Sequence, residues 1–231
     1  MHPTVKAARV AGGIYLSEVL VGPFSLIYVP NALIVTDDAA ATAARILAHE
    51  TMFRLAILAD LIDGVLSIFL MLALYRLLKE VNHYQAVLMV ILGGIVVAPI
   101  FFLNALNWIA VLALVHGGAY LTAFTTPQLN ALAMLFLHLH SQGNIVNGIF
   151  WGLWLFPFGW LVMKSGFLPR LLGIWLLIDG LAYLVLSVIG IVAPQYQGAA
   201  FLIAQPALFA ELAITLYLLI WGANVKPSRA A

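Results

Sequence analysis

The chain has 231 residues, of which 65% are hydrophobic and only 8% are charged, whereas an ordinary soluble domain carries about 25% charged residues. Residues this apolar cannot cover a water-facing surface, so a soluble globular protein is excluded. The formal net charge is +1, and no basic surface suggests a nucleic-acid partner. The absence of cysteine excludes disulfides, thiolate catalysis and cysteine zinc sites.

Six apolar stretches approach or exceed the length of about 20 residues that crosses the hydrocarbon core of a bilayer. They lie near residues 10–30, 52–78, 84–114, 142–163, 169–193 and 200–222. The sequence therefore predicts an all-α polytopic membrane protein with six transmembrane helices. We find no linker long enough to divide it, so a single transmembrane domain is expected over residues 1–231.

The basic residues predict an orientation. With alternating spans, eight of them share one side of the membrane: Lys6, Arg9, Arg76, Lys79, Lys164, Arg170, Lys226 and Arg229. Arg45 and Arg54 lie toward the other side. Cytoplasmic segments carry the excess of Lys and Arg, so both termini are expected in the cytoplasm.

Two segments are longer than a membrane span requires. From Asp37 to Leu78 only Gly64 interrupts the helical pattern, and Asp37 and Asp38 could cap the start of this helix. The pattern from Thr126 to Lys164 also predicts a helix, which Gly143 is expected to bend. We therefore expect residues 37–50 and 127–141 to form a small helical cap outside the membrane.

Carboxylates are the most informative residues inside the spans, because a charged aspartate at a helix centre costs roughly 2.5–3.5 kcal/mol to insert. No Lys or Arg lies deep enough to pair with them. Helical spacing places further polar residues on the same faces. The residues expected to line an acidic intramembrane cavity are Glu18, Asp60, Asp63, Asn104, Asn107, Asn144, Asn147, Asp179, Tyr183 and Glu211; Gly22 and Ser25 share the face of Glu18.

Three of these acids fall near one depth in their spans, namely Asp63, Asp179 and Glu211. We expect at least two of them to face a shared cavity that holds water, an ion or a ligand. The alternative is that neutral acids and amides form structural hydrogen bonds between helices, each worth about 0.6 kcal/mol in a membrane.

The histidines suggest a weaker hypothesis. His49, His116 and His140 fall near the outer interface, close to Glu50, and three imidazoles with a carboxylate would suit zinc or another transition metal. His138 and His140 are two residues apart and must point in nearly opposite directions on one helix. No His-Glu-x-x-His motif, phosphate loop or nucleophile elbow is present, so an enzyme is not favoured and no cofactor is indicated.

Small residues on the fourth span predict close helix packing. Gly148 and Gly152 form a Gly-x-x-x-Gly pattern, and Gly159 follows two turns later. Such glycines let another helix approach the backbone closely. Packing within the chain is the favoured use, and an oligomer contact is the alternative.

The fourth and fifth spans also carry a family resemblance. Residues 150–157 read FWGLWLFP and residues 165–173 read SGFLPRLLG. With Arg9, Gly12, Tyr15, Phe53-Arg54 and the region of Glu211, they resemble the bacterial membrane protein family catalogued as domain of unknown function 4386. The resemblance covers nearly the whole chain and implies a multi-pass protein of the bacterial inner (cytoplasmic) membrane. It implies no activity, cofactor or substrate.

The favoured hypothesis is that an acidic interior binds or conducts a small cation, protons or a polar ligand. The alternative is an accessory or scaffolding subunit of a larger membrane assembly, and a membrane-embedded metalloenzyme is third. The partners expected are the lipid bilayer, a small cation or polar ligand, and either further copies of the chain or a larger membrane complex.

Overall fold

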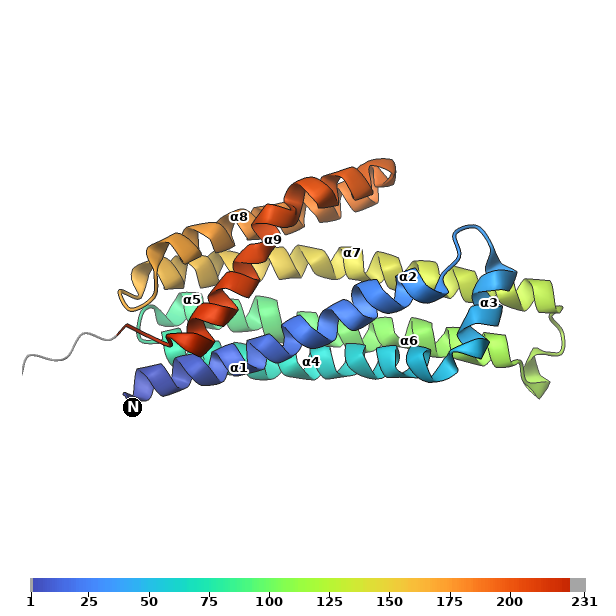
Figure 1. Cartoon of the computed structure of the whole chain (residues 1–231), viewed down its shortest axis with the longest axis horizontal. Coiled ribbons are helices and arrows are strands. Elements are labelled where there is room, and N and C mark those ends of the chain that lie inside the picture. Colours follow the sequence, from blue (N-terminus) through green and yellow to red (C-terminus); the bar gives the residue numbers. More distant parts are fainter. Residues whose placement is uncertain (1, 225–231) are drawn as a thin grey trace, which may run out of the picture. The chain divides into compact units, whose positions relative to one another are not determined.

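The computed structural model describes residues 2–224, and every regular element within them is a helix. The elements are α1 (Pro3–Pro23), the π-helical turn η1 (Phe24–Tyr28), α2 (Val29–Leu33), α3 (Ala39–Ala48), α4 (Glu50–Leu78), α5 (His83–Val90), the π-helical turn η2 (Ile91–Ile95), α6 (Val97–His116), the 3-10 turn η3 (Ala119–Leu121), α7 (Thr126–Lys164), α8 (Arg170–Val192), the 3-10 turn η4 (Pro194–Tyr196) and α9 (Gln197–Ile220) (Figure 1).

Among the described residues, six helical stretches are long and apolar enough to cross a membrane. They are Pro3–Leu33, Glu50–Leu78, His83–His116, Thr126–Lys164, Arg170–Val192 and Pro194–Ile220. The prediction of an all-α multi-pass membrane protein is confirmed. Lys226 and Arg229, which contributed to the predicted orientation, lie outside the described residues.

The helices form two compact units, each with its own apolar core. Unit 1 comprises residues 1–19, 65–98 and 145–231, and unit 2 comprises residues 20–64 and 99–144. Helices α1, α4, α6 and α7 contribute residues to both units.

In unit 1, α7 and α8 pack at backbone distance. A Cβ atom added to Gly152 would lie 2.6 Å from the carbonyl oxygen of Gly180, and one added to Gly159 would lie 2.7 Å from that of Gly173. Such distances leave no room for any side chain. The prediction that these glycines serve helix packing within the chain is confirmed.

Unit 1 also contains the hairpin of α8 and α9, which pack against each other (Figure 1). The turn that precedes the hairpin contains Gly166, whose φ of 70° is in the left-handed region that glycine adopts readily. Pro169 then precedes α8 with an extended ψ of 123°, as expected for proline at the start of a helix.

The core of unit 2 gathers side chains from α2, α3, α4, α6 and α7. Phe53 and Trp108, both almost fully buried, lie with their ring centroids 5.0 Å apart. Ile46 of α3 and Leu137 of α7 belong to the same cluster. Segments 37–50 and 127–141 therefore contribute helices to one packed region, and their position outside the membrane stays a prediction.

The expectation of one continuous helix from Asp37 to Leu78 is wrong. Asp38 does cap a helix, since its carboxylate accepts a hydrogen bond of 2.8 Å from the N–H of Ala41. That helix, α3, ends at His49, where φ is −123° and ψ is 38°. These angles are far from helical values, and α4 begins at the next residue.

Candidate functional site

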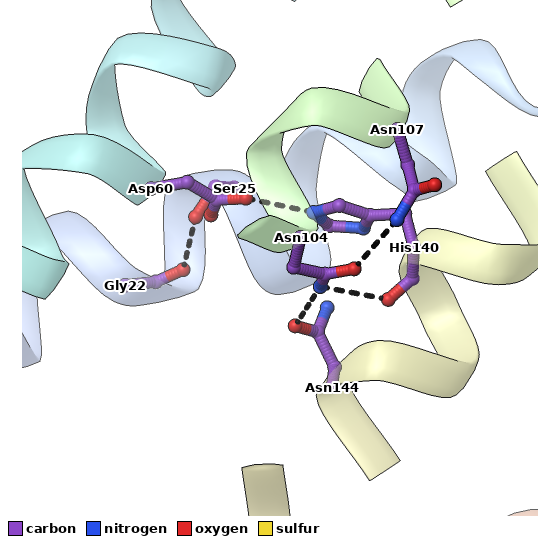
Figure 2. Close-up of polar contacts among 7 residues, drawn as sticks. All are labelled: Gly22, Ser25, Asp60, Asn104, Asn107, His140 and Asn144. Atoms are coloured by element: carbon purple, nitrogen blue, oxygen red, sulfur yellow. Dashed lines mark hydrogen bonds and ion pairs between the residues drawn. The ribbon is translucent and has the colours of Figure 1, made fainter. Parts of the chain in front are cut away.

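Unit 2 contains a polar group that we call the His–Asp cluster. Its buried members are Asp60 of α4, Asn104 of α6 and His140 of α7, and its half-buried members are Asn107 of α6 and Asn144 of α7. Figure 2 shows these side chains pointing toward one another among three helices. All five lie on apolar helices that are long enough to span a membrane.

The contact between His140 and Asp60 is the centre of this cluster. His140 Nε2 lies 2.7 Å from Asp60 Oδ2, and the two residues are 3% and 1% exposed. Nε2 donates to the carboxyl oxygen in the imidazolium and in the Nε2–H tautomer, whereas in the Nδ1–H tautomer it accepts from a protonated carboxyl group. The His140 ring also stacks on Trp108, with the ring centroids 4.1 Å apart. Packing and a hydrogen bond together hold this imidazole in place.

Three asparagines orient the helix that carries His140. Asn104 Nδ2 donates to the main-chain oxygen of His140 at 3.0 Å and to Asn144 Oδ1 at 2.9 Å, while Asn107 Nδ2 donates to Asn104 Oδ1 at 3.1 Å (Figure 2). Gly143 makes room for this network, because its Cβ would lie 2.2 Å from Asn104 Oδ1. α7 continues as one helix through Gly143, and the bend expected there stays a prediction.

A basic partner for Asp60 was not predicted from the sequence, because no Lys or Arg lies deep in a span and His140 was expected near the outer interface. His140 is instead buried, and His138, two residues earlier on α7, is exposed. This opposition agrees with the predicted helical geometry. The spacing of His140 and Asn144, one turn apart, was a usable signal that His140 faces the polar interior.

Asp63 lies one turn after Asp60 on α4 and interacts with it electrostatically. Asp63 is 7% exposed, and its Oδ1 atom has no hydrogen-bond partner among the described residues; the same holds for Oδ1 of Asp60. On α1, Gly22 lies against Asp63, since a Cβ added there would be 2.9 Å from Asp63 Oδ2. Ser25, fully buried, donates to the Gly22 carbonyl oxygen at 3.2 Å (Figure 2).

Unit 1 contains a second polar group, the tyrosine–acid cluster: Tyr15 and Glu18 of α1, Asp179 and Tyr183 of α8, and Glu211 of α9. The Tyr15 hydroxyl donates to Glu211 Oε2. Glu211 also interacts with the Tyr183 hydroxyl and with Asp179. Three helices therefore bring their acids and phenols to one place.

Asp179 is the least satisfied member of the tyrosine–acid cluster. It is fully buried, and its carboxylate lies near the main chain of Glu211, but neither oxygen forms a hydrogen bond of normal geometry with a described residue. Buried polar atoms are nearly always paired in folded proteins, so an unpaired one requires an explanation such as a proton, an ion or a water molecule.

The other predicted cavity residues fall in one unit or the other. Asp179 and Glu211 lie together in unit 1, whereas Asp63 belongs to unit 2. That at least two of these three acids face a shared cavity stays a prediction. Asn147 is in unit 1 and 1% exposed, with Oδ1 unpaired among the described residues.

The three histidines proposed as metal ligands are not gathered. His49 is exposed, His116 Nε2 lies 3.1 Å from Glu50 Oε2, and His140 is paired with Asp60. Glu50 also forms an ion pair of 2.6 Å with Arg54. Within residues 2–224 no group of three or more His, Cys, Asp or Glu side chains is arranged to hold a metal ion. The break at His49, which the sequence did not reveal, changes the direction of that segment.

A family model described as "Domain of unknown function (DUF4386)" matches residues 10–222. No curated protein and no solved structure matches the chain.

Proposed function

This chain belongs to the DUF4386 family of membrane proteins, and we propose that it binds a proton or small cation at the tyrosine–acid cluster and conducts it across the bilayer. The observation that carries this proposal is Asp179, a fully buried acid that forms no hydrogen bond of normal geometry with a described residue, beside Glu211. An intramembrane acid of this kind marks an ion or proton pathway by default.

Charge balance supports a positively charged ligand. The sequence has no Lys, Arg or His between Arg170 and Lys226, so α8 and α9 carry no base of their own beside Asp179 and Glu211. Two carboxylates in a site of low dielectric repel each other when both are ionised. A proton or a cation relieves this repulsion, and the hydroxyls of Tyr15 and Tyr183 are suited to hold the acids in position.

The proposal predicts that amide substitutions abolish transport without unfolding the protein. Glu211→Gln and Asp179→Asn keep the side-chain shape and the capacity for hydrogen bonds, but they remove the ionisable group. In liposomes that contain a pH-sensitive dye, we expect wild-type protein to dissipate an imposed pH gradient. We expect both variants to match protein-free liposomes, with the wild-type elution volume on size exclusion.

Glu80→Gln is the matched control, because Glu80 is exposed and lies between α4 and α5. It should conduct as the wild type does. If the two amide variants also conduct normally, the acids are structural hydrogen-bonding groups and the conduction pathway lies elsewhere. A wild-type protein that does not dissipate the gradient would favour the scaffolding function, in which the chain serves a larger membrane assembly.

We also propose that the protein lies in the bacterial inner membrane with both termini in the cytoplasm. The excess of basic residues at the ends of the spans near residues 6–9, 76–79 and 164–170 supports this orientation. The α2–α3 connection and the segment from His116 to Thr126 would then face outward.

Cysteine labelling tests the orientation cleanly, because the chain has no cysteine. Cysteines introduced at the exposed positions Asp38 and Thr125 should react with a membrane-impermeant maleimide in intact cells. A cysteine at Glu80 should react only after lysis. The reverse pattern would show that the termini face outward.

A further inference from the structure

We propose that two copies of this chain associate within the membrane through the face of α9 that carries Gln205. The proposal does not depend on ion conduction, and the residues that carry it belong to unit 1.

The exposure of α9 is the first observation. Of the six spans, the one that contains α9 is the least buried, since 22% of its most apolar stretch lies inside the protein, against 56% for the span of α7. Within unit 1, α9 packs against α8 (Figure 1). Its exposed side chains include Leu202, Phe209 and Leu216. Lipid tails alone cover an apolar face of this kind, so the partner is inferred from the polar groups of the face.

Gln205 interrupts this apolar face. Helical spacing places five residues on it, namely Gly198, Leu202, Gln205, Phe209 and Leu216. Gln205 is exposed, whereas the other polar side chains of α9 are buried or half-buried: Gln197, Glu211, Thr215 and Tyr217.

Gln205 also lies deep in its span. The middle of α9 falls between Leu208 and Phe209, so Gln205 is about 5 Å from mid-span at a rise of 1.5 Å per residue. The hydrocarbon core of a bilayer is about 30 Å thick. Its amide therefore faces a region that has no water to accept or donate a hydrogen bond.

Pro206 adds an acceptor beside this amide. Because proline has no N–H, the main-chain carbonyl of Leu202, four residues earlier, lacks its helical donor. Leu202 lies on the same face as Gln205. The carbonyl oxygen of Pro206 itself is used within the chain, since it accepts a hydrogen bond of 3.0 Å from Trp175 Nε1.

A second copy of α9 matches these groups. A side-chain amide has two N–H donors and a carbonyl acceptor, so it is complementary to itself, and a two-fold axis brings the same patch of both subunits together. Gln205 can then donate across the axis to the amide oxygen or to the Leu202 carbonyl. Gly198, two turns away, permits close approach, because a Cβ added there would have no atom within 4 Å.

The first test is Förster resonance energy transfer between labelled copies in liposomes, measured over a range of protein-to-lipid ratios. The chain has no cysteine, so a single cysteine at the exposed position Thr125 carries the dye. We expect wild-type protein to form dimers. Gln205→Leu should raise the dissociation constant of the dimer about five- to tenfold, which corresponds to two interhelical hydrogen bonds of about 0.6 kcal/mol each. Gln205→Asn, which keeps an amide, should raise it less.

Oxidative cross-linking in membranes locates the contact. We expect Leu202→Cys to form a disulfide between two copies. Ile95→Cys should not, because Ile95 is exposed in unit 1 but lies on another span.

Two variants serve as controls for the dissociation constant. Gln195→Leu removes an exposed glutamine of η4, outside α9, and it should dimerise as the wild type does. Asp179→Asn should also leave the dimer unchanged, which separates this contact from the proposed conduction.

Three results would overturn the proposal. Wild-type protein could stay monomeric at every protein-to-lipid ratio, which would mean that lipid or a different protein covers this face. Gln205→Leu could dimerise as tightly as the wild type. Ile95→Cys could cross-link as strongly as Leu202→Cys, which would show that the copies collide without a specific contact.

Discussion

Replacing His140 with alanine is expected to lower the free energy of unfolding by about 1–3 kcal/mol, the usual cost of leaving a buried polar group without its hydrogen-bond partner. The substitution leaves Asp60, which is 1% exposed, without its hydrogen bond of 2.7 Å. It also removes the ring that stacks on Trp108. We expect the loss to exceed that from any exposed position on α7.

The double variant His140→Ala/Asp60→Asn distinguishes charge from packing. Because the amide is uncharged, it should restore a large part of the stability that His140→Ala alone removes. Reversible unfolding of the purified protein in mixed micelles measures both losses. His138→Ala is the matched control, since His138 is exposed on the same helix, and it should be close to neutral. Equal losses for His138→Ala and His140→Ala would contradict the pairing.

The second large effect is expected at the contact of α7 and α8. A methyl group added to Gly152 would lie 2.6 Å from the carbonyl oxygen of Gly180 and 3.1 Å from Cβ of Tyr183. Backbone atoms cannot turn aside as a flexible side chain can, so the two helices must separate. We expect Gly152→Ala to cost about 1–3 kcal/mol, as overpacking of a core does.

Gly13→Ala provides the comparison, because no atom lies within 4 Å of the added methyl group. Alanine is also the better helix former, so this variant should be neutral or more stable by about 0.5–1 kcal/mol. The two variants can be compared by their Tm in one detergent. A similar Tm for both would show that α7 and α8 do not pack at backbone distance.

The amino-acid sequence was sufficient for the class of protein and for the number and position of the spans. Burying about 20 apolar residues in lipid is a local property of each segment, so no knowledge of its neighbours is needed. The packing role of Gly152 and Gly159 was also predictable from the sequence. A glycine lets another helix approach its backbone closely, whichever helix that is.

The sequence also predicted which helix faces are polar, because residues three and four apart share a face. Asp60, Asp63 and Asn104 are buried as this spacing implies. It did not show that the helix breaks at His49, because no glycine or proline stands near that position. The metal hypothesis relied on the height of each histidine along its own helix, and within residues 2–224 no group of three or more such side chains is arranged to hold a metal ion.

Which side chains meet was decided by the tertiary structure alone. Asp60 and His140 are 80 residues apart in the chain, and Tyr15 and Glu211 are 196 apart. Helical periodicity places each of them on a face of its own helix but does not determine the neighbouring helix or the rotation between the two. The neighbour and the rotation of a helix depend on how two helices pack against each other. The contact between Asp60 of α4 and His140 of α7 is therefore a property of the tertiary structure (Figure 2).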